Sequence, residues 1–140
     1  MTIPRGPEDI TPAWLGAVLG ADVTEVDVTA IGTGQTGATS RVAATYSAGT
    51  ASGGTESAPP TTFAVKLPAQ DDAVRERVAL GYLSEVEFYS AITDNVAIPV
   101  PGCFHSEISS DGADFVLLLA DLAPAVQGDQ IAGCSPAEAA

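Results

Sequence analysis

Positive charge is scarce in this chain of 140 residues. Lysine and arginine together number 5, against 18 aspartates and glutamates, and the formal net charge is −13. Nucleic acids and anionic membrane surfaces are bound through clustered lysines and arginines. The composition therefore predicts neither a nucleic-acid partner nor a membrane partner. Any site for a phosphorylated ligand must gather its few positive groups locally.

Cysteine, histidine and long apolar runs are also scarce. The cysteines are Cys103 and Cys134, without a CxxC spacing, and His105 is the only histidine, so we expect no metal site. Two separated thiols fit a reducing compartment, and we expect a cytoplasmic protein. The longest purely apolar run, residues 115–120, is too short to span a bilayer, and the amino terminus has no apolar signal core.

What is present is the pattern of one globular domain, with 46% hydrophobic residues. Thr11 followed by proline is typical of a helix start and Gly20 of a stop, and residues 71–93 form a longer helical segment. Period-two alternation predicts five strands, at residues 23–31, 42–46, 63–68, 103–108 and 115–120. The small polar residues 47–62 read as a flexible hairpin tip. We therefore expect an α+β fold: a five-stranded antiparallel sheet with one main helix, preceded by a short helix.

A glycine-rich run separates the first two predicted strands. Gly32, Gly34 and Gly37 form a GxGxxG pattern. Backbone N–H groups in such a loop can cradle a phosphate, and glycine leaves room for a ligand to touch the backbone. The same pattern is also typical of a plain hairpin turn, so the loop by itself leaves both interpretations open.

Two charged residues stand in apolar surroundings. Lys66, the only lysine, lies inside an apolar strand on the same face as Ala64. At 100° per residue, Glu85 falls at the centre of a helix face formed by Val78, Tyr82, Phe88, Tyr89 and Ile92. A carboxylate there requires a cation, and Lys66 is the first candidate, with Arg41 as its rival. The alternatives are a lysine that protects an edge strand from pairing and a glutamate that reaches water.

In this order the motifs resemble the amino-terminal lobe of the protein-kinase-like fold. More narrowly, they resemble aminoglycoside phosphotransferases and choline-kinase-like small-molecule kinases. The stretches that carry the resemblance are residues 31–37 (IGTGQTG), 63–66 (FAVK), 85–89 (EVEFY) and 115–122 (FVLLLADL). Together they cover nearly the whole chain, and the last is similar to the strand that leads into the hinge between two lobes.

The resemblance implies a nucleotide site with ATP as the cofactor. The phosphates would be covered by the backbone of Gly32, Thr33, Gly34, Gln35, Thr36 and Gly37. Lys66 would contact the α- and β-phosphates, and Glu85 would orient Lys66; these are the two candidate catalytic residues. Ala64 would leave space for the base. The base edge would be bound by backbone groups of Ala120, Asp121 and Leu122. The implied reaction transfers the γ-phosphoryl group of ATP to a hydroxyl group of a small molecule.

The resemblance also divides the chain. Residues 1–22 would be an amino-terminal helical segment, residues 23–122 the nucleotide-binding lobe, and residues 123–140 the start of a carboxyl lobe. Ser135-Pro136-Ala137-Glu138 is a helix start signal, so we expect a carboxyl lobe that is missing here. In the family that lobe supplies an aspartate base and the ligands of Mg²⁺, and nothing after Leu122 resembles them. The chain by itself is therefore expected to be inactive.

Two other classes of function remain open. GxGxxG is also the fingerprint of a dinucleotide-binding βαβ unit, but there the loop must open a helix. The second alternative is a non-catalytic binding module with the fold of a kinase lobe. In that case Tyr82, Phe88 and Tyr89 would form a partner surface. Apolar area exposed at such a lobe interface is expected to favour self-association.

Overall fold

The computed structural model describes residues 2–32, 36–48, 59–125 and 131–139. The helical elements are η1 (Pro7–Asp9), α1 (Pro12–Leu19), α2 (Asp72–Glu87), η2 (Phe88–Ile92), η3 (Thr93–Asn95) and α3 (Pro136–Ala139). The strands are β1 (Val23–Ile31), β2 (Gly37–Tyr46), β3 (Thr62–Pro68), β4 (Cys103–Ile108) and β5 (Phe115–Ala120). Within the described ranges, every helix falls short of the length and hydrophobicity that crossing a membrane requires.

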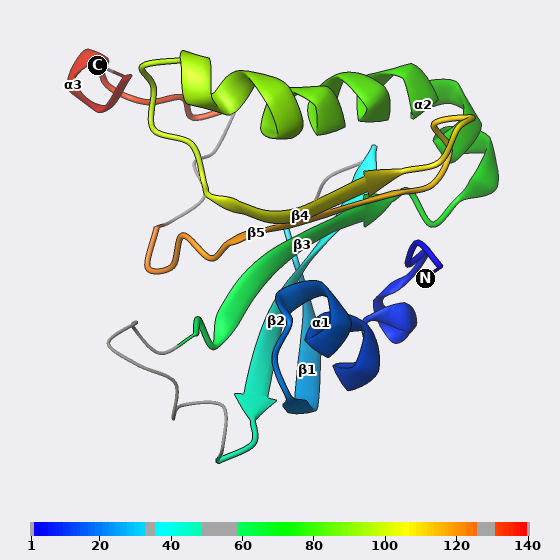
Figure 1. The fold of residues 1–140 in the computed structure, drawn as a ribbon. Helices are drawn as coiled ribbons and strands as arrows, with labels where there is room; N and C mark the ends of the chain where they lie inside the picture. Colours follow the sequence, from blue (N-terminus) through cyan, green and yellow to red (C-terminus); the bar gives the residue numbers. More distant parts are fainter. Residues whose placement is uncertain (1, 33–35, 49–58, 126–130, 140) are drawn as a thin grey trace.

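The strands form one five-stranded sheet in the order β1-β2-β3-β5-β4, and every neighbouring pair is antiparallel. The predicted α+β fold is confirmed, with α2 as its main helix and α1 as the short helix before the sheet. β3 lies in the middle, between β2 and β5 (Figure 1). A side chain on β3 therefore faces one of two covered sheet surfaces and not an open edge.

Helix α1 covers one face of the sheet. Its predicted ends are confirmed: the Thr11 side chain accepts a hydrogen bond from the Trp14 N–H at 3.2 Å, and Gly20 ends the helix with a φ of 64°. Trp14 and Leu15 are buried in a core cluster with alternate residues of the strands. Those strand residues are Val42, Ala44, Phe63, Val65, Leu67, Val116 and Leu118.

Helix α2 covers the opposite face (Figure 1). Tyr82 and Val86 pack there with Phe115, Leu117 and Leu119. Successive residues of a strand point to opposite faces, so β5 is apolar throughout because both of its faces are covered.

The sequence predicts the extent of the main helical segment but not its buried face. Asp71 caps α2 by accepting a hydrogen bond from the Val74 N–H at 3.0 Å, and the π-helical η2 follows the α-helix directly. The prediction that Glu85 lies at the centre of the apolar face is wrong. Val86 is 6% exposed and Ile92 is 45% exposed, so the buried face centres nearer Val86 and Glu85 lies at its edge. The change from i→i+4 to i→i+5 bonding at η2 lies after Glu85, so it shifts only the later positions, such as Ile92, out of the phase that the helical wheel assumes.

A buried arginine on α2 joins segments that lie far apart in the sequence. Arg75 is 6% exposed, and its Nε donates a hydrogen bond to the Ala69 carbonyl at 3.1 Å. Its Nη1 lies 3.2 Å from Asp72 Oδ1 and 3.9 Å from Asp114 Oδ1. Asp114 in turn lies 2.8 Å from the Arg5 Nε. Arg75 therefore ties the β3–α2 connection to the turn between β4 and β5.

The variant Arg75→Met tests this network. Methionine keeps much of the aliphatic stem but removes the donor to the Ala69 carbonyl and leaves Asp114 with Arg5 alone, so we expect a loss of about 1–3 kcal/mol in the free energy of unfolding. Urea denaturation followed by circular dichroism measures the loss. Arg77→Met, at an exposed position two residues along α2, is the matched control and should change stability by less than about 0.5 kcal/mol. Equal effects of the two variants would contradict the proposed network.

Candidate functional site

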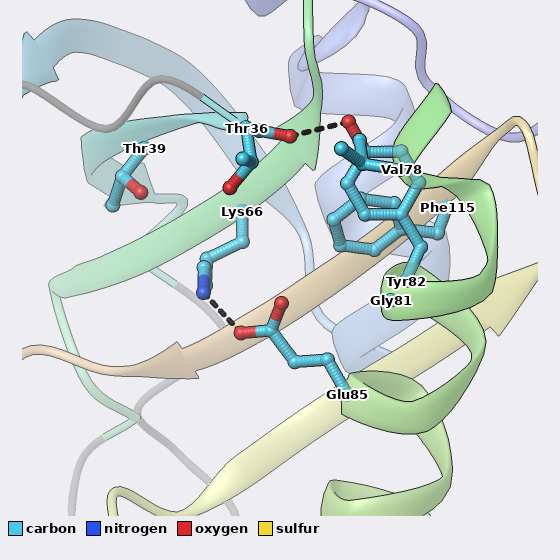
Figure 2. Close-up of a pocket in the computed structure, with 9 residues that line it drawn as sticks. Thr36, Thr39, Lys66, Val78, Gly81, Tyr82, Glu85 and Phe115 are labelled. Atoms are coloured by element: carbon cyan, nitrogen blue, oxygen red, sulfur yellow. Dashed lines mark hydrogen bonds and ion pairs between the residues drawn. The ribbon is translucent and has the colours of Figure 1, made fainter. Parts of the chain in front are cut away.

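A cleft of about 480 Å³ lies between the sheet and α2, on the face opposite to α1. Figure 2 shows Thr39 of β2 and Lys66 of β3 on one side of it and the α2 side chains on the other, with Phe115 of β5 beside Tyr82. The lining residues are Thr36, Gly37, Thr39, Lys66, Val78, Gly81, Tyr82, Glu85 and Phe115. Four of these residues belong to the sequence-predicted site: Thr36, Gly37, Lys66 and Glu85.

Lys66 and Glu85 meet across this cleft. The Lys66 ammonium donates a hydrogen bond to Glu85 Oε1, and the two form an ion pair (Figure 2). The predicted pairing is thus confirmed. Their side chains are 32% and 30% exposed. Because β3 is a central strand, the alternative of a lysine that protects an edge strand is wrong. The other alternative was a glutamate that only reaches water. The structure instead gives Glu85 a specific cationic partner.

Thr36 and Gly37, at the carboxyl end of the glycine-rich segment, line one end of the cleft. Gly32 directly follows β1 and has a φ of 76°, and Gly37 begins β2. A Cβ on Gly37 would lie 3.2 Å from the Leu67 carbonyl oxygen, so a side chain at this position would require the Leu67 carbonyl to move by a few tenths of an ångström. Thr33, Gly34 and Gln35 lie outside the described residues. Since the segment leads into an antiparallel strand and opens no helix, the dinucleotide-binding βαβ interpretation is wrong.

An ion pair crosses the same face of the sheet beyond Lys66. Arg41 on β2 is the register partner of Ala64 on β3. The Arg41 guanidinium reaches Asp121, with Nε 2.9 Å from Oδ2 and Nη2 3.4 Å from Oδ1. Arg41 is therefore not the partner of Glu85. The bridge thus starts beside Ala64, where the resemblance implies space for a base, and Ala64, Arg41 and Asp121 are not among the described residues that line the cleft.

The backbone of the predicted hinge segment is partly engaged within the protein. The Ala120 N–H donates to the Gly102 carbonyl at 2.8 Å. The Leu122 carbonyl accepts from the Ala125 N–H at 2.9 Å, and the Ala123 N–H donates to Asp121 Oδ1 at 3.0 Å. A base at this end of the cleft would have to use other backbone groups of the segment.

Sequence reasoning misplaced one aromatic residue and missed one polar residue. Tyr82 is 4% exposed and lies against Phe115, so its inclusion in an exposed partner surface is wrong; Phe88 and Tyr89 are half-buried. Thr39 was missed, although it is the register partner of Lys66. The glycine-rich turn sets only the register of β1 with β2, and the long connection between β2 and β3 leaves their register open, so no local signal in the sequence indicated that Thr39 pairs with Lys66.

The pKa values of two groups near the site are shifted in opposite directions. Burial raises the pKa of the Tyr89 hydroxyl, and the Glu85 carboxylate adds to the rise. The Ala123 N–H, with further contributions from the Arg41 guanidinium and the Thr62 hydroxyl, holds the pKa of Asp121 below its ordinary value, although burial acts the other way. Asp121 is thus stabilised as a carboxylate.

Groups of three or more His, Cys, Asp or Glu side chains that could hold a metal ion are absent from the described part of the chain. No family model, curated protein or solved structure matches this chain. The functional argument therefore rests on the geometry of the cleft and on the motifs that form it.

The lowered pKa of Asp121 predicts a pH dependence of stability. The stabilisation from its charged form is present above the ordinary aspartate pKa of about 4 and is lost as the pH falls through the lower pKa of the folded state. The difference in the free energy of unfolding between wild type and Asp121→Asn should therefore be constant above about pH 5 and shrink at lower pH. Urea denaturation from pH 2.5 to 7 measures it.

Asp94→Asn, at an exposed position in η3, is the control for removing one negative charge from an acidic chain. Two results would contradict a lowered pKa of Asp121 in the folded state. One is a difference in the free energy of unfolding between wild type and Asp121→Asn that stays the same at every pH. The other is the same pH dependence in Asp94→Asn.

Proposed function

We propose that the cleft binds the phosphates of ATP, and that the chain is the ATP-binding half of a phosphotransferase acting on a small-molecule hydroxyl group. The observation that carries the proposal is the Lys66–Glu85 ion pair in the wall of a cleft that Thr36 and Gly37 close at one end. The cleft therefore combines a fixed cation with a glycine-rich backbone segment, the two kinds of group that bind polyphosphates.

Stability alone does not account for this ion pair. Both side chains are about one-third exposed, and a pair of that kind contributes only about 0.2–1 kcal/mol. An apolar residue at position 66 would extend the packing around Leu117, its register partner on β5. The lysine instead keeps a charge accessible from the cleft. A ligand that carries negative charge can meet it there without unfolding any element.

The size and lining of the cleft suit part of a nucleotide. Ligand pockets range over about 300–1,000 Å³, and this cleft measures about 480 Å³. Among the described residues, Lys66 is the only cation that lines it, and Thr39 lies on the same sheet face as the register partner of Lys66. The phosphates would lie between these two side chains and the glycine-rich segment, with the base toward Ala64.

Glu85 has a specific task in this arrangement. A lysine side chain is flexible, and the carboxylate on α2 holds the Lys66 ammonium at one place in the cleft. A cation that is already in position stabilises the charge of a transferring phosphoryl group without reorganising. Mg²⁺ enters the proposal only as the counter-ion of the ATP phosphates, since the resemblance places its protein ligands in a carboxyl lobe.

The binding part of the proposal is tested with Lys66→Met. Loss of a charge-assisted contact to phosphate should weaken binding of Mg·ATP about ten- to a hundredfold in isothermal titration calorimetry. Glu85→Gln should weaken it less, because the ammonium remains but is held by a neutral partner. Arg77→Met removes the same charge from the exposed face of α2 and should leave the affinity unchanged. A wild-type chain without affinity for Mg·ATP, or equal losses in Lys66→Met and Arg77→Met, would overturn the proposal.

The catalytic part predicts that the chain on its own transfers no phosphoryl group. The resemblance assigns the base and the metal ligands to a carboxyl lobe, and nothing after Leu122 resembles them. A coupled assay for ADP release, with aminoglycoside and choline acceptors, should stay at the level of a blank without protein. Sustained ADP release that depends on an acceptor would contradict this expectation, and its loss in Lys66→Met would assign the turnover to the cleft.

A further inference from the structure

The hydroxyl of Tyr82 joins three segments of the chain beside the cleft. It accepts a hydrogen bond from the Ala69 N–H at 2.9 Å and donates one to the Thr36 carbonyl (Figure 2). Ala69 follows β3, and Thr36 is the last described residue of the glycine-rich segment before β2. Tyr82 itself is 4% exposed. A buried hydroxyl that both accepts and donates is held in one orientation.

Packing of the ring does not require this hydroxyl. The Tyr82 ring lies on Phe115 with ring centroids 4.4 Å apart and an interplanar angle of 35°, in a cluster with Leu117 and Leu119. Phenylalanine would make the same ring contacts. What the hydroxyl adds is its pair of bonds to the backbone of Thr36 and Ala69.

Tyr82 and Glu85 are three residues apart on α2, so they lie on one face of the helix, and both line the cleft. Helix α2 therefore carries the anchor of the glycine-rich segment and the partner of Lys66. The next residue of the segment, Gly37, is fitted closely against the Leu67 carbonyl. The carboxyl end of the segment is thus held by α2 on one side and by β3 on the other.

We propose that Tyr82 is a positioning residue that ties the carboxyl end of the glycine-rich segment to α2. Thr36 and the Lys66–Glu85 pair then keep one relative position in the absence of nucleotide. This inference rests on the proposed function, because the relative position matters when both contact the phosphates of one ligand. A backbone group that is already in place is not ordered at the moment of binding, and this preorganisation raises affinity.

Tyr82→Phe separates the tether from the packing. We expect the affinity for Mg·ATP to fall about three- to tenfold, the effect of one or two lost hydrogen bonds. Affinity for adenosine, which has no phosphates for the segment to meet, should stay unchanged. Calorimetry with both ligands gives this comparison. Without any ligand, amide hydrogen exchange should become faster at Ala69 and at residues 36–39.

Tyr46→Phe is the matched control. The Tyr46 hydroxyl also donates to a backbone carbonyl, that of Pro60 at 2.6 Å, but at the other end of β2. This variant should leave ATP affinity and exchange at residues 36–39 as in wild type. If Tyr82→Phe and Tyr46→Phe behave alike, or if Tyr82→Phe weakens adenosine and ATP equally, the positioning role is overturned. A wild-type chain that binds no ATP would instead overturn the proposed function, and unchanged exchange at residues 36–39 in Tyr82→Phe would still refute the tether.

Discussion

The strict alternation of side chains along β3 is the constraint on which the arrangement of the cleft depends. Phe63, Val65 and Leu67 point into the core under α1, so Ala64 and Lys66 must point toward α2. A shift of one residue in the pairing of β3 would bury the lysine under α1 and turn the apolar set toward α2. Because β3 is central, with partners on both sides, its register is determined by β2 and β5 together. The position of Lys66 is therefore a property of the whole sheet.

The few cations of this acidic chain mostly connect segments that are distant in sequence. Arg5 meets Asp114, Arg41 meets Asp121, and Lys66 meets Glu85. Arg75 joins Asp72 and Asp114. Except for Arg75–Asp72, which lies within α2, each pair joins two different segments of the fold. One consequence is that a polyanion in the cleft would meet a single positively charged side chain among the described lining residues, Lys66, so hydroxyl and backbone groups would have to supply the remaining contacts.

Local signals predict the elements well, and long-range contacts limit what can be predicted of the site. Thr11 and Gly20 predict the ends of α1, and alternation predicts the strands, because both depend on neighbouring residues. The Lys66–Glu85 pair is predictable because only one lysine exists. The Arg41–Asp121 bridge joins residues 80 positions apart and follows from the strand order, which no local pattern contains. The hydrogen bond from Tyr82 to Thr36 depends on how α2 lies over the sheet, and helix periodicity gives the face but not that position.

The partial exposure of the Lys66–Glu85 pair has opposite consequences for folding and for binding. Solvent reduces what the pair contributes to stability, since water competes for both charges. The same access lets a phosphate approach the ammonium while Glu85 still holds it. A fully buried pair would stabilise the fold no better and would have to break before a ligand could bind. The edge position of Glu85 on α2, which differs from the central position that the helical wheel predicts, is thus what allows one lysine to be both held by the protein and available to a ligand.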